Sequence, residues 1–201
     1  MIELVVATRN THKTREIQQI LGADFRVRDL AAHPEVSEIV ESGTSFEENA
    51  KLKALAVSTQ LPGLVIGDDS GLEVDALGGA PGIYSARYRG ARATQSDKIN
   101  KLLGELARVH AKEDGRRARF RCVVAFARNG NLHGTFEGIV EGRIADEVRG
   151  ASGFGYDPIF IPEGTRQTFG ELTAEAKNAI SHRAKAIRAL ADRLRRLEIG
   201  G

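Results

Sequence analysis

The chain has 201 residues, of which 41% are hydrophobic and 28% are charged, and its formal net charge is only +2. This composition is typical of a globular protein and excludes a fibrous or disordered chain. Cys122 is the only cysteine, which excludes an intramolecular disulfide and a zinc site built on several cysteines. Aromatic residues make up 5%, with no Trp, so a nucleic-acid surface of many stacked bases is not expected.

The first third of the chain predicts a strand, a polar loop and two helices. Residues 2–7 form an apolar run of strand length, and 8–12 a polar turn. Helices are expected over 13–21 and over 45–59, the second because a serine and a glutamate three residues apart form a capping box at its start. The first residues lack the form of a signal peptide and no apolar stretch could cross a bilayer, so we expect a cytoplasmic protein.

The rest of the chain predicts strands and helices around a hairpin. In order, we expect strands 64–67 and 72–74, helix 94–107, a hairpin of strands 119–128 and 132–148 that turns at Asn129-Gly130-Asn131, and a helix from about residue 181. No internal repeat or low-complexity linker interrupts the pattern. Strands and helices alternate at both ends, which indicates one α/β or α+β folding unit with a mixed sheet.

Two segments near the expected strand ends carry phosphate or metal chemistry. Thr8-Arg9-Asn10-Thr11-His12-Lys13 lies between a strand and a helix, where free backbone N–H groups and the helix dipole suit a phosphate. Asp68-Asp69-Ser70-Gly71 follows an apolar strand, and two adjacent carboxylates repel each other, which is costly without a cation. A Mg²⁺ ion held by one or two of these carboxylates would supply that cation and would also bind substrate phosphates. An ordinary strand-to-helix turn and an aspartate-capped turn are the simpler interpretations. Glu41 is a possible second metal ligand.

Two later segments could recognise a planar ligand. Glycines flank two aromatic residues in 152–158, which allows a ring to stack against a close backbone; a loop held by aromatic residues in the core is the alternative. Ser181-His182-Arg183 begins the final helix, with Ser181 as its expected N-cap and two donor side chains in the first turn. By themselves these last residues are more typical of an exposed cationic pair.

Taken together, the segments resemble a known family. They read Ala7-Thr8-x-Asn10-x-x-Lys13, Glu41-x-Gly43-x-x-Phe46-x-Glu48-Asn49-Ala50-x-x-Lys53-Ala54, Asp68-Asp69-Ser70-Gly71-Leu72, Gly78-Gly79-Ala80-Pro81-Gly82-Ile83-Tyr84-Ser85-Ala86-Arg87-Tyr88, Gly153-Phe154-Gly155-Tyr156-Asp157-Pro158 and Ser181-His182-Arg183. In this order, across nearly the whole chain, they resemble the inosine/xanthosine triphosphate pyrophosphatases, the Ham1-like enzymes that remove non-standard purine nucleotides.

The resemblance implies a fold and an activity. The fold would be α/β: an elongated two-lobed domain, residues 1–201, with a long curved mixed β-sheet flanked by helices and an active site in the cleft between the lobes. The activity would be Mg²⁺-dependent hydrolysis of ITP, dITP and XTP to the monophosphate and pyrophosphate. A homodimer is also implied, with no nucleic-acid or membrane partner.

The resemblance also implies a role for each site residue. Asp69 would be the catalytic proton acceptor and, with Glu41, a ligand of the metal, while Asp68 would support it. The triphosphate is expected on Thr8, Arg9, Asn10, Thr11, His12, Lys13 and Lys53. Further substrate contacts are expected from Ser70, Phe154, Gly155, Tyr156, Asp157, Lys177, His182 and Arg183.

Three residues depart from the family pattern, and two other functions stay open. Arg9 and His12 replace small residues in the phosphate loop, and Ala176 replaces an acid before Lys177. One alternative is a related pyrophosphatase for modified pyrimidine or methylated nucleotides. The other is a nucleic-acid-binding module that uses the arginines of 116–121 and 193–196.

Overall fold

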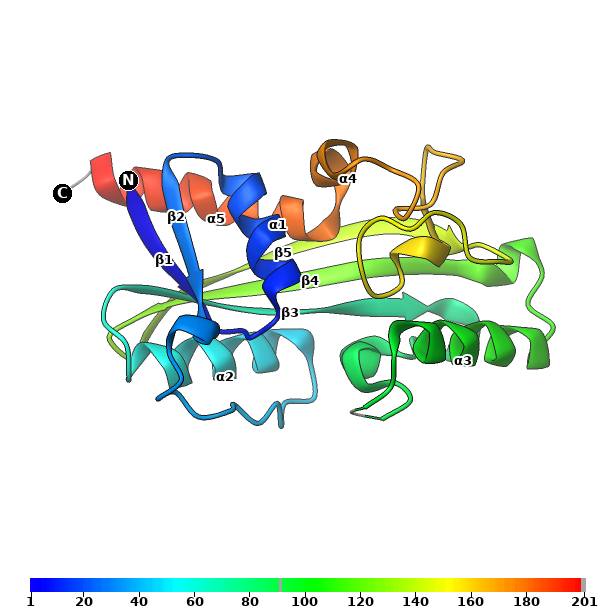
Figure 1. The fold of residues 1–201 in the computed structure, drawn as a ribbon, viewed down its shortest axis with the longest axis horizontal. Helices are drawn as coiled ribbons and strands as arrows, with labels where there is room; N and C mark the ends of the chain where they lie inside the picture. Colours follow the sequence, from blue (N-terminus) through cyan, green and yellow to red (C-terminus); the bar gives the residue numbers. More distant parts are fainter. Residues whose placement is uncertain (91, 200–201) are drawn as a thin grey trace. The chain divides into compact units, whose positions relative to one another are not determined.

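The computed structural model describes residues 1–90 and 92–199, and its six strands form one sheet in the order β2-β1-β3-β4-β5-β6 (Figure 1). The strands are β1 (Ile2–Val6), β2 (Phe25–Asp29), β3 (Leu64–Val74), β4 (Arg117–Arg128), β5 (Asn131–Ile144) and β6 (Phe160–Pro162). β1 pairs in parallel with β2 and β3, whereas β5 and β6 are antiparallel. The expected α/β fold with a mixed sheet is therefore confirmed.

The expected helices are present with small shifts at their ends. The α-helices are α1 (Thr11–Leu21), α2 (Phe46–Ser58), α3 (Gln95–Arg108), α4 (Ala174–Ile180) and α5 (His182–Ile199). Ser45 caps α2 as expected by accepting the N–H of Glu48, and the Glu48 carboxylate accepts the N–H of Thr44. The hairpin turn is also confirmed, because Asn129 and Gly130 both have the positive φ that a tight turn between strands requires.

One expected element boundary is wrong. Residues 64–67 and 72–74 belong to a single strand, β3, which continues through the acidic segment between them. Asp68 and Asp69 therefore lie inside a strand and not in a turn at its end. The short elements β2, β6 and α4 were not predicted, because segments of 5, 3 and 7 residues are too short to show a clear hydrophobic period.

The chain divides into two compact units, of which unit 1 comprises Met1–Asp69, Cys122–Gly138 and His182–Gly201. Successive residues of a strand point to opposite faces of a sheet. Leu4 and Val6 accordingly pack in a core cluster with side chains of α1 and α5, while Ala7 and Val65 pack with side chains that include Val57 of α2. Both faces of this part of the sheet are thus covered by helices.

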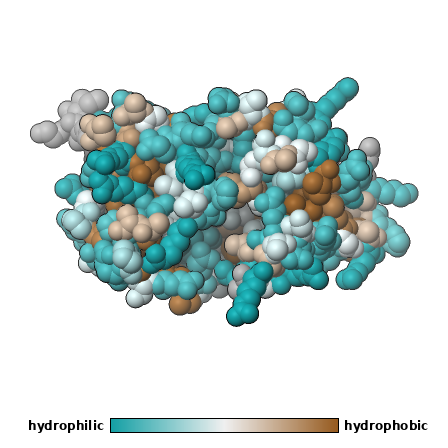
Figure 2. Space-filling view, viewed as in Figure 1, coloured by the Kyte–Doolittle hydropathy of each residue, from teal (hydrophilic) through white to brown (hydrophobic). Residues whose placement is uncertain are grey.

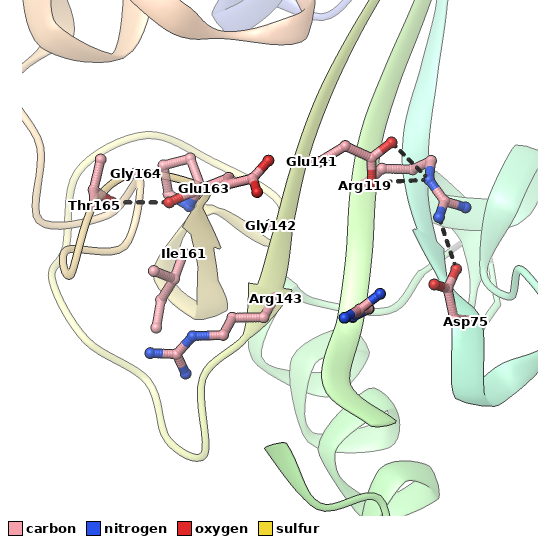
Figure 3. A pocket seen from close by; sticks show the side chains of 11 residues that line it. Asp75, Arg119, Glu141, Gly142, Arg143, Ile161, Glu163, Gly164 and Thr165 are labelled. Carbon is pink, nitrogen blue, oxygen red and sulfur yellow. Dashed lines mark hydrogen bonds and ion pairs between the residues drawn. The ribbon is translucent and has the colours of Figure 1, made fainter. Parts of the chain in front are cut away.

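Unit 2 comprises Ser70–Arg121 and Ile139–Ser181 and has its own core, in which α3 and aromatic residues cover one face of β3, β4 and β5. The opposite face is charged. Arg119 pairs there with Asp75 at 2.9 Å and with Glu141 at 3.1 Å, beside a cavity of about 630 Å³ that these residues line (Figure 3). Arg119 of β4 thus forms its ion pairs with carboxylates of the same unit. None of the predicted site residues lines this cavity.

The face of the molecule shown in Figure 2 is mostly hydrophilic, with small hydrophobic patches between the polar side chains. Within residues 1–90 and 92–199, no helix combines the length and the apolar character that crossing a membrane would require.

Candidate active site

The side chains of the two adjacent aspartates of β3 point to opposite faces of the sheet in unit 1. Neighbouring residues of a strand alternate in direction, and the contacts follow this rule. Asp68 contacts Lys13 of α1 and Arg183 of α5, whereas Asp69 contacts Asn49 and Lys53 of α2. Each carboxylate therefore has its own protein cations.

Asp68 is a buried carboxylate held by three donors. Its partners are the Lys13 ammonium, Arg183 Nε at 2.9 Å and the Cys122 thiol, whose Sγ lies 3.2 Å from Oδ2. Burial by itself would raise the pKa of Asp68, but the charges of Arg183 and Lys13 outweigh it and hold this pKa well below the ordinary aspartate range. Asp68 is therefore ionised at neutral pH inside the fold.

Arg183 lies between two acids and is only 2% exposed. Its Nε donates to Asp68, and its Nη1 donates to Glu16 of α1, which is itself buried. Burial opposes the charge of a guanidinium, but the two carboxylates raise the pKa of Arg183 well above its ordinary value. The side chain is thus held in one orientation, unlike the exposed cation that its sequence context allows.

Asp69 faces α2 and shares a lysine with Glu41. Lys53 Nζ lies 2.9 Å from Asp69 Oδ1 and 2.8 Å from Glu41 Oε1, and Asn49 Nδ2 lies 3.3 Å from Asp69 Oδ2. Burial raises the pKa of Asp69 more than the charges of Lys53 and Lys13 lower it. For Lys53, the attraction of Asp69 and Glu41 exceeds the effect of burial and raises the pKa. The two acids thus converge on a single cation position.

A close approach of α2 to β3 brings these groups together. A β-carbon at Gly67 would lie 2.2 Å from the carbonyl oxygen of Ala50, so only glycine allows the helix backbone to pack this closely on the strand. Asn49 and Lys53 are four residues apart and therefore share the helix face turned to the strand. Asn49 Oδ1 also accepts the N–H of Gly43, which ties the segment before α2 to the same face.

The loop of residues 8–13 is internally hydrogen-bonded. Asn10 caps α1, and its Oδ1 accepts the N–H groups of His12 at 3.0 Å and Lys13 at 3.4 Å, while Thr8 Oγ1 accepts the N–H of Asn10 at 3.1 Å. The expectation of free backbone donors is wrong for these three residues, because the loop's own side chains take them up. Thr11, the first residue of α1, is exposed.

Arg9 points its guanidinium at main-chain carbonyls. Nη1 donates to Leu30 at 2.8 Å and Nη2 to Val36 at 2.6 Å. The side chain therefore joins the loop to the segment that follows β2.

In unit 2, the loop of residues 153–157 is organised by Asp157. One oxygen of this buried carboxylate, Oδ2, accepts both the N–H of Phe154 and the Lys177 ammonium, each at 2.8 Å. Gly153 has a φ of +74°, and a β-carbon there would lie 2.1 Å from the same oxygen. The Lys177 ammonium also lies 4.9 Å from the centre of the Phe154 ring. The loop is rigid around a partly exposed aromatic ring.

Tyr156 belongs to the core of unit 2. It is 4% exposed, and its hydroxyl donates to the carbonyl of Ser85 at 3.1 Å. The Ser85 hydroxyl accepts the N–H of Leu72 and donates to Gly82, so the glycine-rich segment before it connects β3 to the loop.

The predicted site residues are divided between the units. Unit 1 contains Thr8–Lys13, Glu41, Lys53, Asp68, Asp69, His182 and Arg183, while unit 2 contains Ser70, Gly155, the rest of the 153–157 loop and Lys177. His182 begins α5 and is 4% exposed, and Ser70 is partly exposed on β3. Within the described part of the chain, no three His, Cys, Asp or Glu residues are grouped as a metal site.

Three residues that contact Arg183, Asp68 or Asp69 were not predicted as site residues. Glu16, Asn49 and Cys122 each contact Arg183 or one of the aspartates. Asn49 belongs to the segment 41–54 that resembles the family, so its position in that motif could have indicated a role in the site. Glu16 follows Lys13 by three residues and so shares its helix face. Cys122 is buried, and its thiol contact with Asp68 depends on β3, which lies far from it in the sequence.

The chain is similar to known proteins over nearly its whole length. The model of the Ham1 family matches residues 4–193. The dITP/XTP pyrophosphatases of Shouchella clausii (strain KSM-K16) and Bacillus subtilis (strain 168) are 48% and 47% identical, each over 94% of this chain and 95% and 96% of the relative.

Solved structures agree as well. A HAM1 protein from Coxiella burnetii is 39% identical with a TM-score of 0.86, covering 98% of this chain and 100% of that one. The Staphylococcus aureus Ham1 protein is 40% identical with a TM-score of 0.83, covering 96% and 98%. From the extent of these matches, the chain belongs to the Ham1 family.

Proposed function

We propose that this protein is a dITP/XTP pyrophosphatase that hydrolyses dITP, ITP and XTP to the nucleoside monophosphate and pyrophosphate. The observation that carries the proposal is the near-full-length identity of 48% with a dITP/XTP pyrophosphatase. The convergence of Glu41 and Asp69 on one cation position supports it chemically. The enzyme is thus a nucleoside-triphosphate hydrolase of nucleotide metabolism.

Mg²⁺ is the proposed cofactor, and Glu41 and Asp69 would hold it. Mg²⁺ is usually bound by one or two carboxylates, with water and substrate phosphates completing its shell. Both carboxylates accept from the same ammonium, at 2.8 and 2.9 Å, so a single cation between them is compatible with their positions. When bound, the ion would neutralise charge on the phosphate oxygens.

Asp69 is the proposed proton acceptor. Its raised pKa makes the ionised carboxylate a stronger base than an exposed aspartate, and Asn49 and Lys53 fix its two oxygens. In the proposed reaction, a water attacks the α-phosphorus, Asp69 takes its proton, and the bond to the bridging oxygen of the leaving pyrophosphate breaks. Lys13 and Lys53 stabilise the charge that develops there.

The base is proposed to be recognised by His182, Arg183 and the 153–157 loop with Lys177. A guanidinium held by Asp68 and Glu16 loses little freedom when it binds, so its orientation supports selectivity. Donors suit a 6-oxo purine, whereas the 6-amino group of adenine would leave donors facing donors, at a cost of about 1–3 kcal/mol for each unpaired group. Phe154 is proposed to stack on the base.

The test is a substrate panel with product analysis. dITP, ITP, XTP, the four standard deoxynucleotides and a modified pyrimidine triphosphate are each incubated with and without Mg²⁺. We expect Mg²⁺-dependent release of pyrophosphate, detected only after inorganic pyrophosphatase is added, from the first three. Free phosphate without that addition, or a preference for the modified pyrimidine or a standard nucleotide, would contradict the proposal.

A homodimer in the cytoplasm is also proposed, on the family resemblance. Light scattering during gel filtration measures the mass directly, and a value near twice 21.8 kDa is expected. A mass of one chain at micromolar concentration would remove the dimer from the proposal.

A further inference from the structure

Arg9 connects two segments that are distant in sequence. Its two terminal nitrogens donate to two carbonyls, Leu30 at 2.8 Å and Val36 at 2.6 Å, which lie 21 and 27 residues away. Hydrogen bonds from a charged donor are stronger than neutral ones, and the rigid guanidinium fork suits two acceptors at once. The side chain thus makes the bonds of a structural clamp.

The carbonyls that Arg9 binds belong to residues anchored in the core. Leu30 and Val36 are 4% and 0% exposed and pack in the same cluster as Ala7, which precedes the loop. The N–H of Leu30 also donates to the carbonyl of Thr8 at 3.0 Å. Arg9 therefore completes a connection between the end of β1 and the segment that follows β2.

The segment beyond Val36 leads to the metal-binding acid. Residues 33–45 contain no helix or strand, so their polar backbone groups depend on side chains and turns for partners. Ile39 packs partly against the same cluster, and Glu41 two residues later reaches Lys53 at 2.8 Å. The orientation of Glu41 thus depends on how the preceding segment is held.

We propose that Arg9 is a positioning residue that aligns the loop of residues 8–13 with the segment carrying Glu41, and is not one of the cations that bind the triphosphate. This inference rests on the proposed function, and it replaces the expected contact of Arg9 with the triphosphate by a structural role. It follows from the direction of the guanidinium, which is turned toward carbonyls. Lys13, in contrast, places its ammonium on Asp68, next to Asp69 in the chain.

The lysine variant separates the two roles. Arg9→Lys keeps the positive charge, but its single nitrogen cannot replace a fork that places one nitrogen on each of two carbonyls. A phosphate-binding cation would tolerate this change better than Arg9→Ala, whereas a clamp would be lost in both. Arg28→Ala is the control, since it removes an exposed arginine of β2 whose nearest carboxylate is Glu3 at 3.7 Å.

Hydrogen exchange of the free protein, without nucleotide or metal, is the first measurement. The N–H of Val36, bonded to the carbonyl of His33, and the N–H of Ser42, bonded to that of Val40, report on the segment. We expect both Arg9 variants to exchange faster than the wild type in peptides covering 33–44, and Arg28→Ala to match the wild type. Unchanged exchange in Arg9→Ala would overturn the clamp, whatever the activity.

Kinetics with dITP is the second measurement. Both Arg9 variants should need about tenfold more Mg²⁺ for half-maximal rate, the size of effect seen when a residue supporting a metal ligand is removed. Their KM for dITP at saturating Mg²⁺ should stay close to that of the wild type. A raised KM in Arg9→Ala that Arg9→Lys restores, with unchanged Mg²⁺ demand, would make Arg9 a triphosphate cation instead. If the wild type were inactive on dITP and XTP, the proposed function would be refuted. The hydrogen-exchange measurement would then still test whether Arg9 holds the two segments together.

Discussion

At the scale of single residues, the neighbours Asp68 and Asp69 differ because they face different surroundings. Asp68 meets two cations and has a pKa well below the ordinary range, while burial dominates for Asp69 and raises its pKa. One carboxylate is thereby fixed as a structural anion. The other keeps a proton affinity suited to a base.

Asp69→Asn should reduce pyrophosphate release from dITP by about 10²-fold or more, because the amide keeps the volume but neither accepts the proton nor binds the cation. Steady-state rates at saturating Mg²⁺ are the measurement. Asp75→Asn, which removes an exposed aspartate paired with Arg119, is the control and should leave the rate unchanged. A near-normal rate for Asp69→Asn would exclude it as the proton acceptor.

Asp68→Asn and Asp69→Asn should affect the free energy of unfolding in opposite ways at pH 7. The folded-state pKa of Asp68 lies below its unfolded value, so its contribution is fully present above the ordinary aspartate range and is lost only as pH falls through the folded pKa. Asp68→Asn should therefore destabilise by about 3–5 kcal/mol, the cost of breaking a buried pair. The pKa of Asp69 is raised, so any stabilisation it provides exists below the unfolded pKa and disappears as pH rises through the folded one.

Asp69→Asn should consequently melt at or above the wild-type temperature in the absence of nucleotide and metal. Urea unfolding and calorimetry of the two variants, side by side from pH 4 to pH 8, provide the comparison. Equal losses of stability in both variants at pH 7 would show that the two carboxylates do not differ in the stated way.

At the scale of elements, the contact of α2 with β3 sets the distance between Lys53 and Asp69. Gly67→Ala should move the helix away, since the new methyl group would lie 2.2 Å from the Ala50 oxygen, and should cost about 1–3 kcal/mol or more together with much of the activity. Gly104→Ala is the matched control: this exposed residue of α3 has nothing within 4 Å of an added β-carbon. It should gain up to about 1 kcal/mol with unchanged activity. Thermal melts and dITP kinetics measure both, and a fully active, stable Gly67→Ala would disprove the close approach.

At the scale of the whole molecule, each unit has its own core and its own predicted site residues. Lys13 belongs to unit 1 and the 153–157 loop to unit 2. The proposed function assigns Lys13 to the triphosphate and the 153–157 loop to the base. Substitutions at these two places should therefore change different kinetic parameters.

Lys13→Ala should lower kcat/KM for dITP and XTP by similar factors, because it removes a charge from the triphosphate and not from the base. Tyr156→Phe removes only the hydroxyl that donates to Ser85, and should change the ratio of dITP to dATP by loosening the loop. Tyr84→Phe is its control, since it removes the hydroxyl of an exposed tyrosine of the same unit. The kcat/KM values of the three variants for dITP, XTP and dATP decide the point. A strong shift between dITP and XTP in Lys13→Ala, with an unchanged ratio in Tyr156→Phe, would reverse the assignments.

Much of the fold was determined by the sequence alone, because its signals are local. Ser45 and Thr94 mark the starts of α2 and α3 through side chains that accept the first backbone N–H groups, and Asn129-Gly130 turns the hairpin because these residues tolerate positive φ. The family motifs likewise indicated where chemistry would be concentrated. Such signals depend on neighbours within four residues.

Only the tertiary structure decided what surrounds each charge. The segment Asp68-Asp69-Ser70-Gly71 is turn-like in composition, and it continues β3 because Lys13, Lys53 and Arg183, from three different helices, compensate the buried carboxylates. The same holds for Arg9, whose acceptors lie 21 and 27 residues away. The free energy of a buried charge depends on the groups within a few ångströms in space, and those groups are brought together only when the chain has folded.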